Sequence, residues 1–185
     1  MSIKRTLLIL VAIAGATVAY CASLNTKSWD EEVKLNDGRV IIVTQKRKFD
    51  GGIARETWLT IRLSEFSPRD IVWHEHLNPY VVNVYKNKLY VVGNFPTDLE
   101  FRLYGKPMPR YVGFSFESGE WKRIAAENIP EAIYNTNMVI DGAYKVTTKR
   151  LTLEMKASEE FNGDGRLRAA PHLLRLDPSH KGNYD

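Results

Sequence analysis

Short stretches in which apolar and polar residues alternate recur through most of the chain. The alternation is clearest in residues 57–63, where the polar side carries Trp58, Thr60 and Arg62 and the apolar side carries Leu59, Ile61 and Leu63. Successive side chains of a β-strand point to opposite faces. This stretch therefore predicts a strand with one buried and one solvated face.

Turn residues separate most of these stretches and predict hairpins. Asn36-Asp37-Gly38 separates residues 33–35 from 40–43, Lys86-Asn87-Lys88 separates 80–85 from 89–92, and Glu117-Ser118-Gly119-Glu120 separates 111–116 from 121–124. Residues 71–76 add a further strand. About eight short strands with such turns predict a mainly β fold, an antiparallel β-sandwich or a partly open barrel.

The pattern changes toward the C-terminus. Residues 94–110 are rich in proline, glycine and charge and are interpreted as a long connection, and residues 128–133 as one helical turn. Thr152 is placed to cap a short C-terminal helix over 153–161. We therefore expect a β-rich domain over residues 28–161, followed by a polar, loosely packed tail over 162–185.

The N-terminus has the pattern of a targeting segment. Lys4-Arg5 precedes the uncharged apolar run 6–19, and small residues surround Cys21. This order is typical of a signal peptide or membrane anchor, here residues 1–22. Three fates stay open: an uncleaved anchor, cleavage after Ala19, or lipidation of Cys21, although Tyr20 stands where a lipobox has a small residue. Export to the bacterial periplasm or cell envelope, attached to the membrane, is expected.

Composition limits the number of domains and the classes of function that the chain can have. The 185 residues, 44% of them apolar, suffice for one core, and Cys21 is the only cysteine, so the domain has no internal disulfide. The net charge is +4, of which Lys4 and Arg5 supply two. The remainder is too mild for nucleic-acid binding. The basic runs 46–48 and 145–150 are interpreted as solvated.

His74 and His76 are the only metal candidates. On a strand they point to one face about 7 Å apart, which could let them share a zinc or copper ion. A zinc site needs a third protein ligand, and nothing nearby supplies one. Solvated histidines are the favoured interpretation, and we expect neither a metal nor a cofactor. Residues 162–165 suggest a calcium loop but lack its downstream acid.

Catalytic motifs are absent from the sequence, apart from acids that could be paired for sugar hydrolysis. These acids are interpreted as surface charges at edges and loops; they are Asp30, Glu31, Glu32, Asp98, Glu100, Glu159 and Glu160. The tryptophans could form an exposed strip that stacks sugars or a peptide, but a core position is favoured for them. They are Trp29, Trp58, Trp73 and Trp121.

Two stretches, residues 29–41 and 111–124, together with Ile129-Pro130 and residues 135–138, resemble a family of small exported proteobacterial proteins of uncharacterised function. Many of these proteins have a lipoprotein-type N-terminus. The resemblance implies a single exported domain and favours lipidation of Cys21. It implies no activity.

The sequence thus predicts an exported envelope protein that acts as a non-enzymatic binding or interaction module. Its expected partners are the membrane, reached through the N-terminal segment or a lipid, and an unidentified envelope protein or glycan. Two alternatives stay open. One is an envelope glycan hydrolase with two carboxylates, and the other is an inhibitor or immunity-type protein, whose sign would be a projecting loop over residues 94–110.

Overall fold

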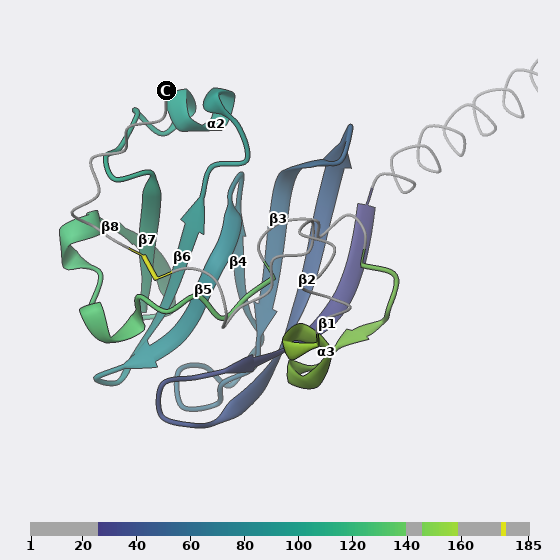
Figure 1. The fold of residues 1–185 in the computed structure, drawn as a ribbon. Coiled ribbons are helices and arrows are strands. Elements are labelled where there is room, and N and C mark those ends of the chain that lie inside the picture. The colour runs from purple at the N-terminus through teal and green to yellow at the C-terminus, as the bar shows by residue number, and fades with distance from the viewer. Residues whose placement is uncertain (1–25, 140–145, 159–174, 177–185) are drawn as a thin grey trace, which may run out of the picture.

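The computed structural model describes residues 26–139, 146–158 and 175–176, which form two packed β-sheets (Figure 1). The mainly β prediction is confirmed, with 51% strand and 13% helix, and the sheets form a sandwich. Sheet A has the strand order β4-β3-β2-β1-β9, and sheet B has the order β5-β6-β7-β8. The strands are β1 (Thr26–Lys34), β2 (Val40–Asp50), β3 (Ile53–Ile61), β4 (Ile71–Glu75), β5 (Asn78–Tyr85), β6 (Lys88–Asn94), β7 (Tyr111–Glu117), β8 (Glu120–Ile124) and β9 (Arg150–Leu151). The helical segments are α2 (Asp98–Leu103), α3 (Leu153–Ala157) and the 3-10 turns η1 (Ala126–Asn128) and η2 (Glu131–Ile133).

Each sheet contains a meander of four consecutive antiparallel strands. In sheet A, β9 adds a parallel strand beside β1. The chain crosses from β4 to β5 through only two residues, His76 and Leu77. Leu77 is 1% exposed, and a Cβ on Gly93 would stand 2.9 Å from its Cβ. The short crossing therefore requires a glycine at position 93.

The main core lies between the sheets. Trp73 of sheet A meets Phe114 of sheet B edge to face, with ring centroids 5.5 Å apart. The other face of sheet B is covered by η1, η2 and Leu176, which form a second apolar cluster. Strands β5 to β7 are thus buried on both faces, which explains continuous apolar runs such as Leu89–Val92.

A buried polar network lies on the inner face of sheet A. Lys156 of α3 reaches Glu31 of β1 with Nζ 3.0 Å from Oε1, and both side chains are at most 1% exposed. The same Nζ donates to the carbonyl oxygens of Glu32 (2.8 Å) and Asn137 (2.7 Å). Glu31 also accepts from the backbone N–H of Val139 at 2.7 Å. These bonds fix α3 and residues 137–139 to β1.

Several predicted boundaries differ from the structure. The helix predicted over 153–161 ends at Ala157, because Ser158 has extended backbone angles. The connection over 94–110 contains α2, and the single turn over 128–133 is two 3-10 turns. Arg47, interpreted as solvated, is 1% exposed.

Residues 1–22, with Cys21, lie outside the described part of the chain, as do residues 159–165. Within the predicted tail, Leu176 is described and is only 3% exposed. No helix among the described residues combines the length and the apolar character needed to cross a bilayer.

Candidate functional site

The two candidate metal ligands lie at the end of β4. His74 is exposed on the outer face of sheet A, stacked on Trp58 at 4.4 Å, with Nε2 3.5 Å from a Glu56 oxygen. His76 Nδ1 lies 2.7 Å from the carbonyl oxygen of Arg55. In the described part of the chain, no three His, Cys, Asp or Glu residues gather closely enough to hold a metal ion.

The four tryptophans occupy different environments. Trp29 and Trp73 are core residues, exposed by 3% and 1%. Trp58 lies on the outer face, with His74 on its ring and the Lys46 ammonium 5.2 Å from its centroid. Trp121 packs on Phe116 at the edge of sheet B. They form no continuous exposed strip.

Two of the acids interpreted as surface charges are buried. Glu31 is inaccessible and Glu100 is 3% exposed. Both are held by cations, Glu31 by Lys156 and Glu100 by Arg55, whose Nη1 lies 2.9 Å from Oε1. The surface interpretation was wrong for both residues.

The most distinctive surface is the segment over residues 97–110, which we call the α2 corner and which projects from one end of the sandwich (Figure 1). It exposes Leu99 by 57%, Leu103 by 69% and Met108 by 50%. Six large apolar side chains are exposed among the described residues, and these are three of them. Leu99 and Leu103 are four residues apart on α2 and so lie on one face of the helix, and a contiguous exposed apolar patch is typical of an interaction site.

Polar anchors fix the α2 corner at its N-terminal end. The Thr97 hydroxyl accepts from the Leu99 N–H at 3.2 Å and donates to Glu100, which binds Arg55. Burial alone would raise the pKa of Glu100, but hydrogen bonds from Thr97, its own backbone and Arg55 outweigh it and lower the pKa. Glu100 therefore stays ionised and ties α2 to β3.

Aromatic contacts fix the rest of the corner. Phe101 and Tyr104 meet Phe95 edge to face, at 5.4 and 5.5 Å. The Arg110 guanidinium lies 4.2 Å from the Phe101 ring centroid and pairs with Asp98 at 2.8 Å. The backbone reverses after the helix through Gly105, whose φ of 81° suits glycine.

Tyr104 also joins the corner to the end of β4. Its hydroxyl donates to Glu75 and accepts from the His76 N–H at 3.3 Å. Burial, together with the Glu75 carboxylate, raises the pKa of Tyr104 well above its ordinary value. The phenol therefore remains a neutral structural donor.

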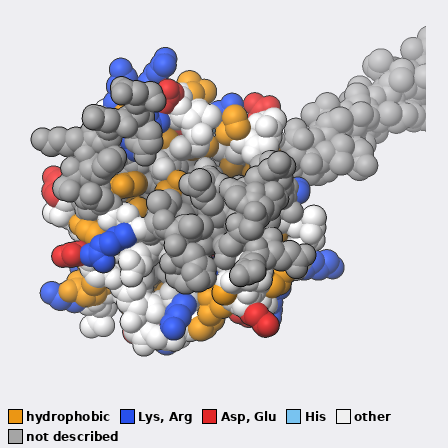
Figure 2. All heavy atoms as spheres, in the orientation of Figure 1, with side chains coloured by type: hydrophobic (Ala, Val, Ile, Leu, Met, Phe, Trp, Pro, Cys, Tyr) orange, Lys and Arg blue, Asp and Glu red, His pale blue; other side chains and the backbone are white. Residues whose placement is uncertain are grey.

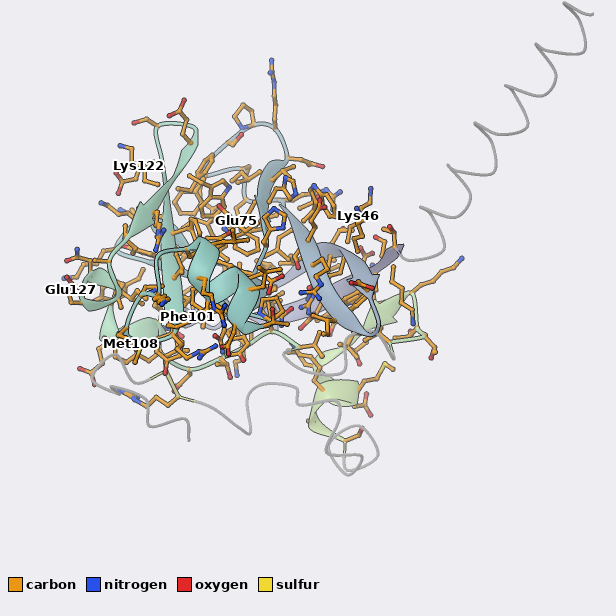
Figure 3. All side chains as sticks on the ribbon, turned by 90° about the horizontal axis from the view of Figure 1, so that it is seen from above. Lys46, Glu75, Phe101, Met108, Lys122 and Glu127 are labelled. Atoms are coloured by element: carbon orange, nitrogen blue, oxygen red, sulfur yellow. The ribbon has the colours of Figure 1, made fainter. Side chains whose placement is uncertain are left out.

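A shallow pocket of about 430 Å³ lies beside the corner. Its lining is mostly apolar and includes Met108, Tyr111, Val112, Ile124, Ala126 and Glu127. Figure 3 places the labelled Phe101, Met108 and Glu127 on one flank of the molecule, away from Lys46. Met108 thus belongs to both the exposed corner and the pocket.

Charges of both signs are mixed on the face of the molecule seen in Figure 2, where Lys and Arg side chains lie among Asp and Glu. Every carboxyl group with a clearly shifted pKa among the described residues is shifted downward, by a neighbouring cation or by hydrogen bonds. These groups are Asp37, Glu65, Asp98, Glu100 and Glu117.

Comparison with known proteins gives no relative: no protein-family model, curated protein or solved structure matches the chain. The geometry of the site is therefore the basis for any functional assignment.

Proposed function

We propose that this protein is an exported, non-enzymatic binding module that recognises another envelope protein through the α2 corner. The observation that carries the proposal is the exposure of Leu99, Leu103 and Met108 on a segment held in place by buried contacts.

Rigidity matters because binding is weakened by the entropy lost when a mobile loop is ordered. We expect the α2 corner to be ordered before a partner binds, since Arg55 holds Glu100 and Phe95 packs on Tyr104. Apolar anchors on such a surface can contribute most of the binding energy of an interface.

The hydrolase alternative has less support. A glycosidase general acid must hold its proton near neutral pH, which requires a raised pKa. The clearly shifted carboxyl groups of the described residues all have lowered pKa values instead. They are arranged to stay ionised, which suits structural ion pairs.

An inhibitor or immunity-type protein is a specific form of the same proposal. The projecting α2 corner is the feature that favours it, because a rigid projection can enter the site of a partner enzyme. The identity of the partner would distinguish this case, since it would be an enzyme that loses activity when bound.

Site-specific photo-crosslinking in native cells tests the binding surface. A photoreactive amino acid at Leu103 should capture one defined envelope protein, and Met108→Asp in the same chain should abolish that adduct. The matched control is the same photoreactive residue at Val40, an exposed apolar position of β2 (51% exposed). An adduct that is equal at both positions, or absent at Leu103, would contradict the proposal.

Location is tested by the mass of the mature N-terminus. A diacylglyceryl group on Cys21, or an uncleaved N-terminus in the membrane fraction, supports membrane attachment. An N-terminus at Tyr20 overturns the attachment and leaves a released protein, and an uncleaved chain in the cytosol overturns export.

A further inference from the structure

Sheet edges expose backbone groups that can pair with another chain, and contacts among the described residues cover parts of three edges. The edge of β1 pairs with β9 at Asp30 and Glu31, so the outer strand on this side of sheet A is only two residues long. At the edge of β5, Asn137 takes the place of a strand, since Oδ1 accepts from the Val82 N–H (3.0 Å) and Nδ2 donates to the Val82 carbonyl (2.7 Å). At the edge of β4, Trp121 donates to the Val72 carbonyl at 2.9 Å.

Strand β8 has no such cover among the described residues. It follows β7 through the two-residue turn Ser118-Gly119, which has positive φ at both positions. In such a hairpin the flanking pair Glu117–Glu120 is hydrogen-bonded, and bonding recurs at every second residue of β8. Trp121 and Arg123 therefore direct their backbone N–H and C=O groups outward, and no described residue pairs with these groups.

The pocket lies at the end of this edge. Arg123 and Ile124 of β8 line it, together with Met108. Ile124 and Lys122 are two residues apart on the strand, so they share one face. A strand added to β8 would thus pass an exposed cation and then an apolar pocket.

We propose that β8 accepts an extended segment of a partner protein as a fifth strand of sheet B. This inference rests on the proposed binding function and specifies the ligand. The segment carries an acidic residue that faces Lys122 and, two positions away on the same face, an apolar residue that enters the pocket. Main-chain hydrogen bonds to Trp121 and Arg123 supply affinity, and the pocket supplies specificity.

Charge favours a different protein over a second copy of this chain. Self-pairing of two β8 strands would bring Lys122 and Arg123 of each copy close to the same cations of the other, and like charges across strands are destabilising. The Lys122 side chain is 57% exposed, and its one ion pair among the described residues is a 3.5 Å contact with Glu117. It remains accessible to an acidic partner residue.

A displayed library of short random linear peptides, selected on the purified full chain, tests the proposal. We expect selected peptides to share an acidic and an apolar residue separated by one position. Amide hydrogen exchange should slow at Trp121 and Arg123 when such a peptide binds. Lys122→Glu should change the selected acidic position to a basic one.

Two substitutions at one position separate backbone pairing from side-chain effects. Arg123→Pro removes an outward N–H and should weaken peptide binding about tenfold, the effect of one to two lost hydrogen bonds. Arg123→Ala keeps that N–H but loses the same guanidinium, which donates to the Tyr104 carbonyl oxygen at 3.1 Å, so it is the reference against which the tenfold loss is measured. Peptides N-methylated at alternate positions give the same comparison in the unaltered protein.

The outcomes distinguish this inference from the proposed function. Peptide binding without protection of the β8 amides, no selected peptides, or concentration-dependent dimerisation lost with Arg123→Pro would each overturn the strand-addition proposal. If the Leu103 adduct forms nevertheless, the binding function stands and only its ligand is wrong. If that adduct also fails to form, both proposals fall.

Discussion

At the scale of single residues, the ion pair between Glu31 and Lys156 joins segments that are 125 positions apart. Lys156→Met should destabilise the domain by about 3–5 kcal/mol, because it leaves the Glu31 carboxylate buried without its cation. Urea unfolding followed by tryptophan fluorescence measures the change.

A double variant tests whether the loss of stability comes from the uncompensated charge of Glu31. Glu31→Leu combined with Lys156→Met should recover part of the lost stability, since it removes the uncompensated charge. The matched control is Lys27→Met in β1, a lysine that is more exposed than Lys156. A Lys156→Met variant as stable as this control would show that the pair contributes little.

The buried position of Glu31 follows from the sequence, whereas its partner does not. Trp29 and Val33 flank Glu31 at a spacing of two, so a strand places all three on one inner face. The run Asp30-Glu31-Glu32 nevertheless has the composition of a surface. No local pattern indicates that a lysine of a distant five-residue helix neutralises it.

At the scale of elements, hairpins were predictable because their signal is local. Gly38 and Gly119 adopt positive φ, as tight turns between strands require. Helix α2 was missed because six residues are too few to show a helical period. Its signal was the spacing of Thr97 and Glu100, which is that of a capping box.

The cover of β5 by Asn137 is a second feature that strand patterns do not indicate. Asn137 makes three side-chain hydrogen bonds, to both backbone groups of Val82 and to the Lys34 carbonyl at 3.0 Å. Asn137→Ala should cost about 1–3 kcal/mol, because the Val82 groups lose partners in a half-buried site. Faster amide exchange at Val82, together with a lower urea midpoint, would report this loss.

Asn135 provides the comparison for that variant. It is exposed two residues away, and Asn135→Ala should leave stability within a few tenths of a kcal/mol, as surface substitutions usually do. If both substitutions changed stability equally, the side-chain amide of Asn137 would not be the cause of the loss.

At the scale of the whole molecule, alternation predicted the strands of sheet A, which have one buried and one solvated face. Strands β6 and β7 of sheet B are buried on both faces, and the turns between the strands indicated them instead. The predicted site was less complete, since the α2 corner depends on distant partners. Arg55 holds Glu100 across 45 positions, and Glu75 holds Tyr104 across 29. Residue patterns indicate that a loop exists, and only the packed sheets determine that it is rigid.

The lowered carboxyl pKa values make a prediction for the stability of the whole domain. A group whose pKa is lower in the folded state stabilises it when ionised, and this contribution is lost as the pH falls through the folded value. The free energy of unfolding should therefore be constant near neutral pH. It should decrease as the pH drops below 4.5, the ordinary pKa of a glutamate. Urea unfolding at a series of pH values measures the profile.

Glu100 is the buried residue among the carboxyl groups with lowered pKa values. It should therefore account for a distinct part of the stability that is lost at acid pH. Glu100→Gln should lower stability at neutral pH, because the charge-assisted bond to Arg55 is lost, and should flatten the acid limb of the profile. Glu117→Gln is the control, since that side chain is 31% exposed against 4% for Glu100, so solvent screens its ion pair more and the profile should change little. If the acid limb is unchanged in Glu100→Gln, the carboxylates of the surface, and not the anchor of the α2 corner, govern acid unfolding.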